Sequence, residues 1–401
     1  MAKIRPFRAI RPNPFYISQL VFTKPQSESA SGEENGGLKP LKTLLETGAR
    51  QRPETPEGQM AAYHDIRETF QNLLDRDQLW QEESPAIYIY EVIHPTYRQT
   101  GVWALTSLDD YHSSAIKTHE LTFADSVRRI RNYRAGTGLE GSPVLLAYPP
   151  DGTVNAVIAV AKTGRPHAVF GNQQGFHRVW KIEDQHLQET LIDAFGRIKT
   201  VYLADGHHRL EAAAMIKPEA DAITSLYMAT DELRIQEYDR VVIPGSYIDQ
   251  NELVRELSKH FFIQDSRKPV RPKEAHRFGM CLNGEWYHLL VKAHSYIGKT
   301  LSENIDAAIL QQQVFAPMFG ITDPKTNPQL KSVGGEKAME EIVELLHSHP
   351  AAIAFTLFPL TIEQIIAVAD AGEVLPPKST WIDPKVPYGL ILYQHPLNEN
   401  R

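Results

Sequence analysis

The stretch of the chain richest in residues that can do chemistry is Leu203–Ala214, with the sequence LADGHHRLEAAA. Its apolar start leads into a turn at Asp205 and Gly206, and the alanine-rich part predicts a helix directly after that turn. A helix start presents backbone N–H groups and a partial positive charge, which suits a phosphate. Because glycine has no side chain, Gly206 lets the backbone approach a ligand closely. The pattern therefore predicts a phosphate-binding turn.

The side chains of this turn suggest how a phosphate would be held. Arg209 offers a planar fork of donors for phosphate oxygens, and His207 and His208 can donate hydrogen bonds or move protons. Asp205 can hold a divalent cation or orient a histidine. A structural explanation fits equally well: Asp205 as a helix N-cap, with Asp205–Arg209 and His207–Glu211 as surface pairs four residues apart. Spacing alone leaves both explanations open.

A zinc site in this stretch is disfavoured, because the adjacent His207 and His208 point to different faces of a helix and lack the HExxH spacing. The single cysteine, Cys281, cannot form an intramolecular disulfide, which predicts a reducing, cytoplasmic location.

Length and charge narrow the possible functions. The 401 residues suggest two or three domains. With 42 Lys and Arg against 49 Asp and Glu, the net acidic balance argues against a nucleic-acid partner, although a local basic pocket stays possible. The sequence has no uncharged apolar run approaching the roughly 18 residues of a membrane span, so no membrane association is expected.

The elements that position the turn can be predicted from hydrophobic periodicity. Residues 24–58 are rich in Gly, Pro, Ser and Glu and predict a long loop. A strand–turn–helix is expected at 200–216, and a pair of strands at 143–148 and 154–161 is expected around the turn at 149–152. The other expected strands are 86–92, 101–105, 177–182, 223–229, 240–243, 352–358 and 389–393, and the other expected helices are 60–79, 123–133, 186–197, 251–260, 304–319, 336–347 and 362–369. A second unit is expected to begin near Pro244, with a hairpin turn at Asn283-Gly284.

Seven segments, in order along nearly the whole chain, resemble a widespread prokaryotic family catalogued as a domain of unknown function (number 1015). They are IRPFRAIRP, PAIYIYEV, LDDYHSSAIKTHELT, SPVLLAYPPDG, YLADGHHRLEAAA, EYDRVV and VADAGEVLPPKSTWIDPKVPYGL. The chain departs from the family pattern after its opening motif, where it has NPFYISQLVFTKPQ.

The core of that family resembles the ParB/sulfiredoxin-like fold, in which a strand with a Pro-Val start precedes a turn carrying G-x-x-R. Ser142–Val144 and Gly206–Arg209 match these two features. The resemblance implies an α+β protein with a catalytic core at 85–243. An N-terminal strand, loop and helix would occupy 1–84, and a C-terminal α/β extension 244–401.

Among proteins with such a turn, the free-serine kinases fit best. Sulfiredoxin chemistry needs a cysteine beside the turn, whereas Cys281 falls in the second unit, and a partition-type DNA clamp would need basic faces. The kinase resemblance implies that Glu120 is the base that takes the hydroxyl proton. His119 would orient a phosphate or the amino-acid carboxylate. Without the resemblance, His119 and Glu120 would be a solvated loop pair.

A second group of interest is Lys378-Ser379-Thr380, which lacks the spacing of a Walker motif. Lys378 is expected to reach the phosphate, and Ser379 and Thr380 to contact the substrate; the structural alternative is a turn entering the last strand.

Two further expectations concern charged side chains. Asp239 and Arg240 are expected to form an ion pair, and at least two of three helical arginines are expected to be solvated: Arg128, Arg129 and Arg131.

The sequence thus predicts a phosphotransferase acting on a small-metabolite hydroxyl, most specifically free L-serine. The donor would be ATP, ADP or pyrophosphate, with magnesium (Mg2+) at Asp205. The alternatives are a phosphatase acting on O-phosphoserine or a similar phosphomonoester, and a non-catalytic nucleotide-sensing module. The sequence does not predict the direction of the chemistry or the oligomeric state.

Overall fold

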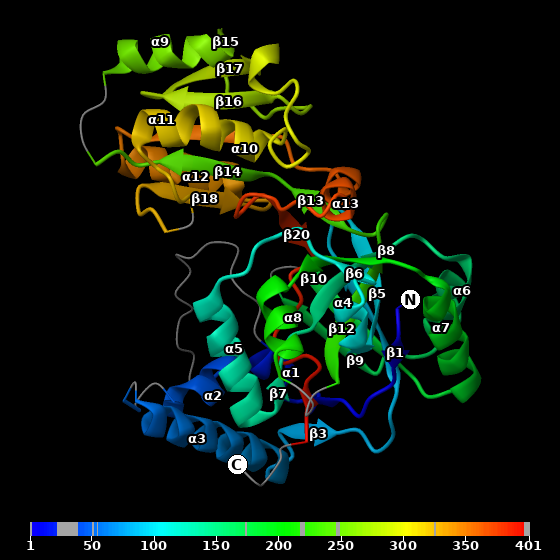
Figure 1. The fold of residues 1–401 in the computed structure, drawn as a ribbon. Helices are drawn as coiled ribbons and strands as arrows, with labels where there is room; N and C mark the ends of the chain where they lie inside the picture. Colours follow the sequence, from blue (N-terminus) through cyan, green and yellow to red (C-terminus); the bar gives the residue numbers. More distant parts are fainter. Residues whose placement is uncertain are drawn as a thin grey trace.

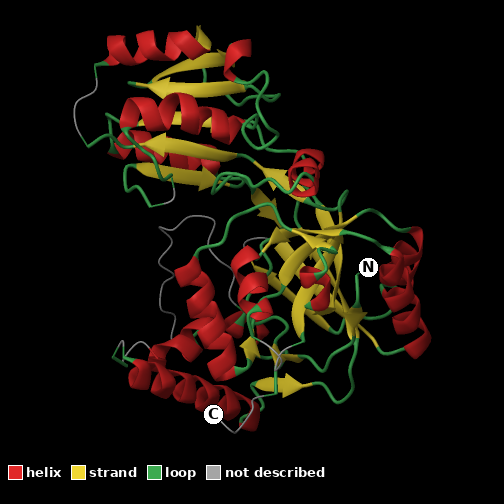
Figure 2. Ribbon diagram, viewed as in Figure 1, coloured by secondary structure: helices red, strands yellow, loops and turns green. Residues whose placement is uncertain are grey.

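The structure is a computed structural model that describes residues 2–21, 39–49, 52–53, 55–172, 175–216, 221–245, 249–324 and 326–396. Two β-sheet bodies with their helices make up the molecule, the smaller one above the larger in the view of Figures 1 and 2. The fold is α+β, as the sequence predicted. No helix in these ranges combines the length and the apolar character needed to cross a membrane.

The larger body is built on a mixed sheet in the order β6-β11-β8-β12-β5-β4-β10-β9, with β1 paired to β5. The pairs β8–β12 and β6–β11 are parallel and the other pairs are antiparallel. Its strands are β1 (Ile4–Arg5), β4 (Ile87–Ile93), β5 (Arg98–Ser107), β6 (Ile116–Lys117), β8 (Val144–Tyr148), β9 (Ala168–Asn172), β10 (Gly175–Ile182), β11 (Val201–Asp205) and β12 (Ala222–Ala229).

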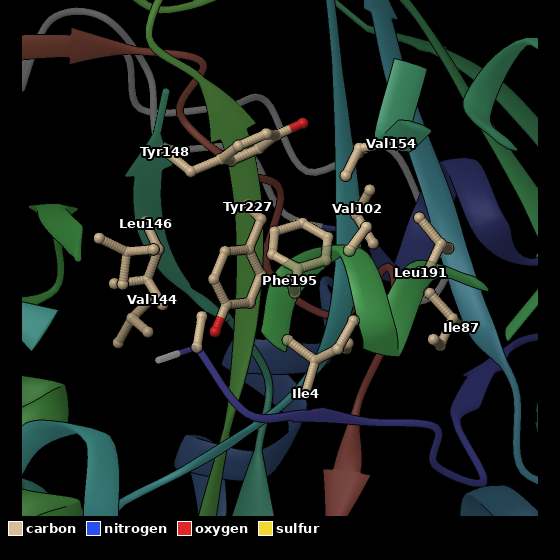
Figure 3. Close-up of a cluster of buried hydrophobic side chains, with 14 of the residues drawn as sticks. Ile4, Ile87, Val102, Val144, Leu146, Tyr148, Val154, Leu191, Phe195 and Tyr227 are labelled. Carbon is tan, nitrogen blue, oxygen red and sulfur yellow. The ribbon is translucent and has the colours of Figure 1, made fainter. Parts of the chain in front are cut away.

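Helices cover one face of this sheet and enclose its core. Phe195 packs between Tyr148 and Tyr227, with ring centroids 5.1 and 4.8 Å apart (Figure 3). Burial of such large apolar rings is a principal source of core stability. The helices with residues in this cluster are α6 (Gly152–Ala161), α7 (Gln185–Arg197) and α8 (His207–Ala214).

The N-terminal segment forms a helical layer beside the sheet. Helix α2 (Leu41–Ala49) packs on α3 (Pro56–Asp75), and α3 packs on α5 (Ala124–Thr137), around a separate apolar cluster. Of the loop predicted at 24–58, residues 24–38, 50, 51 and 54 lie outside the described residues, and α2 occupies part of the remainder. The other elements here are α1 (Ile17–Leu20), α4 (Asp109–His112) and the pair β2 (Ile10–Pro12) and β3 (Leu79–Gln81).

The smaller body is a sheet in the order β15-β17-β16-β19-β14-β18. The predicted hairpin turn joins β16 to β17, and Asn283 and Gly284 there have φ values of 54° and 80°, as a type I′ turn requires. The strands are β14 (Tyr238–Val242), β15 (Phe261–Ser266), β16 (Arg277–Leu282), β17 (Glu285–Val291), β18 (Leu330–Gly334) and β19 (Ile353–Leu357). The helices are α9 (Gln250–His260), a 3-10 turn (Ala293–Ser295), α10 (Asp306–Leu310), a π-helical turn (Gln311–Phe315), α11 (Ala316–Phe319) and α12 (Ala338–Ser348).

The strand pairing differs from the predicted division at residues 243 and 244. Strand β14, assigned by sequence to the core, pairs within the smaller sheet. After β19 the chain returns to the larger body, where α13 (Ile362–Asp370) packs on the core sheet. There β20 (Trp381–Asp383) pairs with β13 (Arg234–Gln236), and β21 (Tyr393–Gln394) pairs with β7 (Leu139–Glu140). The last strand predicted, at 389–393, is therefore reduced to a short pair around Tyr393.

The strand predicted at 154–161 is wrong, because these residues lie in α6. The valine and isoleucine residues of this segment favour a strand locally. A helix forms instead, and the carboxylate of Asp151 caps its start by accepting hydrogen bonds from the backbone N–H groups of Thr153 and Val154 at 2.9 and 3.0 Å. Val154 and Val157 then face the core at helical spacing.

This cap gives a stability prediction. We expect Asp151→Ala to destabilise the fold by about 1 kcal/mol, since it leaves two N–H groups at the start of α6 without their acceptor. Asp151→Asn keeps a capping oxygen and is the matched control. Thermal unfolding of the three proteins provides the measurement, and an unchanged melting temperature in Asp151→Ala would contradict this account of α6.

Candidate functional site

The predicted phosphate turn lies between the end of β11 and the start of α8. The ladder between β11 and β8 is irregular between Leu203 and Asp205, and Gly206 follows with φ of 102°. Such a positive φ favours glycine over other residues. Leu210 and Ala213 anchor α8 in the core, so the start of the helix has a fixed position.

Arg209 lies over this turn. Its guanidinium donates to the Asp205 carboxylate at 2.8 Å, and the Lys385 ammonium lies 3.9 Å from the same carboxylate. A Cβ added to Gly206 would be 2.9 Å from the Arg209 guanidinium. The surface pair that sequence allowed is therefore present, but Asp205 is not the N-cap, since Gly206 occupies that position. Arg209 and Lys385 place two positive charges beside the helix start.

Glu120 lies next to the same turn, although it is far from it in sequence. Its Oε2 is 3.6 Å from Nδ1 of His207, and the ring of His119 meets that of His207 edge-on at 4.6 Å. The contact with His207 is longer than a hydrogen bond. Glu120 forms a parallel bridge with Leu375, whose N–H donates to the His119 carbonyl at 2.8 Å. The solvated-pair alternative is wrong for His119, which is 1% exposed.

Burial decides the charge of the two histidines. It lowers the pKa of His119 to about 4, and, together with His119, it lowers the pKa of His207 well below 6.5. Both rings are therefore neutral at pH 7 and serve as donors or acceptors rather than as cations. Among the described residues, neither nitrogen of His119 nor Nε2 of His207 has a hydrogen-bond partner. The alternative pair His207–Glu211 is not what forms, because Glu211 accepts from Thr122.

His208 has a positioning role. Its Nε2 accepts the N–H of Phe123 at 3.1 Å, and its ring stacks on that of Phe123 with centroids 5.6 Å apart. Because Nε2 is the acceptor, the proton of the neutral ring lies on Nδ1. His208 thus holds the start of α5 against α8, in addition to lining the cavity described below.

The Lys378-Ser379-Thr380 turn is fixed by two hydrogen bonds to backbone carbonyls, one of them from the buried Arg240. Lys378 has φ of 63°, and its carbonyl accepts from the Arg240 guanidinium at 2.7 Å. Ser379 donates to the Pro376 carbonyl at 2.7 Å. This hydrogen bond closes the turn, and Ser379 lines a small neighbouring cavity rather than the one that Lys378 and Thr380 line.

The side chains of Asp239 and Arg240 do not form the expected ion pair, because each is engaged with backbone groups. Arg240 donates to the carbonyls of Tyr238, Asp239 and Lys378, and Asp239 accepts the N–H of Leu357 at 2.8 Å. Burial raises the pKa of Asp239 to about 7 and lowers the pKa of Arg240 to about 10. Arg240 therefore positions the Lys378 turn from the first strand of the smaller sheet.

These segments surround one cavity of about 540 Å³. Four cations line it: Arg129, Arg209, Lys378 and Lys385. Three carboxylates accompany them, from Glu120, Asp205 and Asp383, with His207, His208 and Thr380 also in the wall. The structure thus brings together the predicted residues Glu120, Asp205, Gly206, His207, His208, Arg209, Lys378 and Thr380, with His119 directly behind His207. Such a wall can hold a multiply charged anion beside a carboxylate base.

Sequence reasoning missed part of this wall. Lys385, Asp383, Trp381 and Tyr238 line the cavity, and the Lys385 ammonium lies 5.1 Å from the centroid of the Trp381 ring. The segment WIDPKVPYGL, which is part of the last family-like motif, is the sequence feature that could have indicated these residues. All three helical arginines are exposed, and Arg129 also lines the cavity.

The described residues do not build a magnesium site by themselves. Among them, no three His, Cys, Asp or Glu side chains are grouped to hold a metal ion. Asp205 accepts from Arg209 and has Lys385 nearby. Magnesium commonly uses one or two carboxylates together with substrate phosphates, so the expected Mg2+ would depend on the ligand for most of its coordination.

The two neutral histidines predict how stability depends on pH. Their folded-state pKa values lie below the unfolded value of 6.5, so the unfolded chain binds more protons between about pH 6.5 and 4. We expect stability to fall as the pH drops through this window. In His119→Asn this slope should be shallower, whereas a change at the exposed His64 should leave it as in the parent. Melting temperatures across the window test this; equal slopes in all three proteins would contradict it.

The close packing of Arg209 on Gly206 gives a second prediction. We expect Gly206→Ala to weaken pyrophosphate binding by about tenfold, since the added Cβ displaces the guanidinium. Gly284→Ala is the matched control, because Gly284 also has a positive φ but has open space around it. Calorimetric titration measures the affinities. Equal affinities in the two variants would show that the turn does not bind the anion.

The chain was compared with known protein families, curated proteins and solved structures. No curated protein matches the chain. The solved structures that are similar at low level include a point mutant of a free serine kinase in complex with ADP (15% identity, 74% of this chain, 92% of that chain, TM-score 0.42), C-terminally truncated SbnI from Staphylococcus aureus (13%, 74%, 87%, 0.42) and a conserved hypothetical protein from Pyrococcus furiosus (14%, 72%, 95%, 0.38). A family model described as a protein of unknown function (DUF1015) matches residues 4–309, and the chain therefore belongs to this family.

Proposed function

We propose that the protein transfers a phosphoryl group to the hydroxyl of a small metabolite, with free L-serine as the acceptor. The observation that carries the proposal is the position of the Glu120 carboxylate, 3.6 Å from His207 at the start of α8 and in the same cavity as four cations. The choice of L-serine rests on the resemblance of Glu120 and the ADGHHR turn to the motifs of free-serine kinases.

The proposed step balances as a simple displacement. The hydroxyl oxygen of serine forms a bond to the terminal phosphorus of the donor, while the bond between that phosphorus and its bridging oxygen breaks. The leaving phosphate keeps the electron pair, and Glu120 takes the hydroxyl proton. General-base assistance of this kind contributes roughly 10²–10⁴-fold to the rate, and positioning and electrostatics supply the remainder.

The cations of the cavity would hold the donor. Arg209 can use its planar fork on phosphate oxygens, while Lys378 and Lys385 act as point charges. Asp205 keeps the Arg209 fork in place through their hydrogen bond at 2.8 Å. Thr380 lines the same cavity and has a hydroxyl that can contact the acceptor.

The buried histidines would position the base. His207 contacts Glu120 and is itself packed by His119. Because both rings are neutral, they do not form a permanent ion pair with Glu120, which stays able to accept a proton. A cationic His207 would instead stabilise the ionised carboxylate and weaken it as a base.

The test is an assay of the purified protein with magnesium, L-serine and a donor panel of ATP, ADP and pyrophosphate, following O-phosphoserine. We expect Glu120→Gln to lower turnover by about 10²–10⁴-fold and Arg209→Ala by about 10²–10³-fold. Arg128→Ala removes an exposed arginine that pairs with Asp125 and should keep the parent rate. Omission of magnesium tests whether the donor needs the metal.

Other results would assign a different function. Release of inorganic phosphate from O-phosphoserine without nucleotide would identify a phosphatase. Nucleotide binding without turnover, unaffected by Glu120→Gln, would identify a sensing module. Parent-like rates in both Glu120→Gln and Arg209→Ala would overturn the site assignment itself.

A further inference from the structure

A second cavity of about 580 Å³ adjoins the first. Arg129, Ile130 and Arg209 line both cavities, so the guanidinium that lies over the phosphate turn also borders the second space. The second cavity lies among α2, α5, β7 and the start of β8, and the proposed chemistry does not use it. Its wall also includes Tyr133, Arg134, Glu140, Ser142 and Tyr388.

The wall of this cavity differs in kind from that of the first. Leu45, Ile130, Leu139 and Ile223 contribute aliphatic surface, and Tyr133 and Tyr388 contribute aromatic rings. Burial raises the pKa values of both tyrosines, so their hydroxyls are neutral. Gly141 lets the Tyr388 ring lie directly on the backbone, since a Cβ there would be 2.2 Å from the ring.

Two buried charges in this wall neutralise each other. Arg134 lies 2.8 Å from the Glu140 carboxylate, which also accepts from His395 at 2.7 Å and from the backbone and hydroxyl of Thr224. Although burial opposes ionisation, these partners hold the pKa of Glu140 at about 2. This side of the cavity therefore presents a rigid ion pair with no net charge.

We propose that the second cavity binds the nucleoside of a nucleotide whose phosphates lie at Arg209 and the Asp205–Arg209 turn. The inference rests on the proposed function and names its donor as a nucleotide rather than pyrophosphate. A flat aromatic base and a sugar match a partly apolar wall that carries two tyrosines, whereas pyrophosphate and serine have no apolar part to fill it. The volume lies within the roughly 300–1,000 Å³ typical of pockets for ligands of this size.

The position of Arg209 makes the two cavities parts of one site. A ligand that places its base beside Tyr388 passes Arg129 and Arg209 before it reaches the first cavity, where Lys378 and Lys385 lie. The terminal phosphate then lies on the same side as Glu120 and the acceptor. The second cavity would therefore recognise the nucleoside of the donor, and the first cavity would hold the phosphate that is transferred.

The test compares ADP with pyrophosphate by calorimetric titration. Ser142 is half-buried in the cavity wall, and Ser142→Phe should fill the space. We expect the Kd for ADP to rise by about tenfold or more, with the Kd for pyrophosphate unchanged. Ser142→Ala, the matched control, should bind both ligands nearly as the parent does.

A second measurement keeps the inference testable if Ser142→Phe does not fold. Photolabelling of the parent protein with 8-azido-ADP should modify peptides containing Tyr133 or Tyr388, and excess ADP should prevent it. Labelling confined to other peptides would overturn the inference.

Failure of this inference is distinguishable from failure of the proposed function. If Ser142→Phe binds ADP like the parent, or weakens ADP and pyrophosphate equally, the nucleoside does not occupy the second cavity, and phosphoryl transfer at Arg209 still stands. Parent protein that binds pyrophosphate but no nucleotide gives the same conclusion. If Arg209→Ala binds both ligands as the parent does, the phosphate site and the proposed function fail together.

Discussion

The pairing of Glu120 with Leu375 is the constraint on which the candidate site depends. The N–H of Leu375 donates to the His119 carbonyl at 2.8 Å and so joins a loop of the larger sheet to the returning C-terminal chain. On one side of this bridge Glu120 reaches His207; on the other, the chain enters the turn that carries Lys378. One backbone contact thus places the proposed base and a proposed phosphate ligand together.

The electrostatics of the site follow from which groups are buried. His119 and His207 lie beneath the turn and are neutral because burial disfavours their charged forms. The arginines and lysines of the site line the open cavity, where water can solvate their charges in the absence of a ligand. An anion entering this cavity meets four positive groups, while the two histidines nearest the proposed base are neutral. This separation suits both anion binding and proton abstraction.

Local features were predictable from the sequence, and long-range placement was not. The turn at Gly206, the start of α8 and the Asn283-Gly284 hairpin follow from residue preferences within a few positions. The valine-rich α6 escaped prediction because the Asp151 cap and core packing outweigh its strand preference. The pairing of β14 within the smaller sheet and the position of Lys385 beside Asp205 depend on contacts between segments far apart in the sequence. The family motifs indicated Glu120, but only the three-dimensional arrangement places its side chain beside His207.

The smaller sheet also helps to position the candidate site. Arg240 belongs to β14, yet its guanidinium holds the Lys378 carbonyl at 2.7 Å, and Lys378 has a strained φ of 63°. The buried Arg240 donates its other hydrogen bonds to its own strand, so the turn is tied to a rigid element rather than to solvent. Tyr238 of the same strand lines the cavity. A shift of the smaller body would therefore move Lys378 relative to Arg209, which couples the arrangement of the two bodies to the geometry of the anion site.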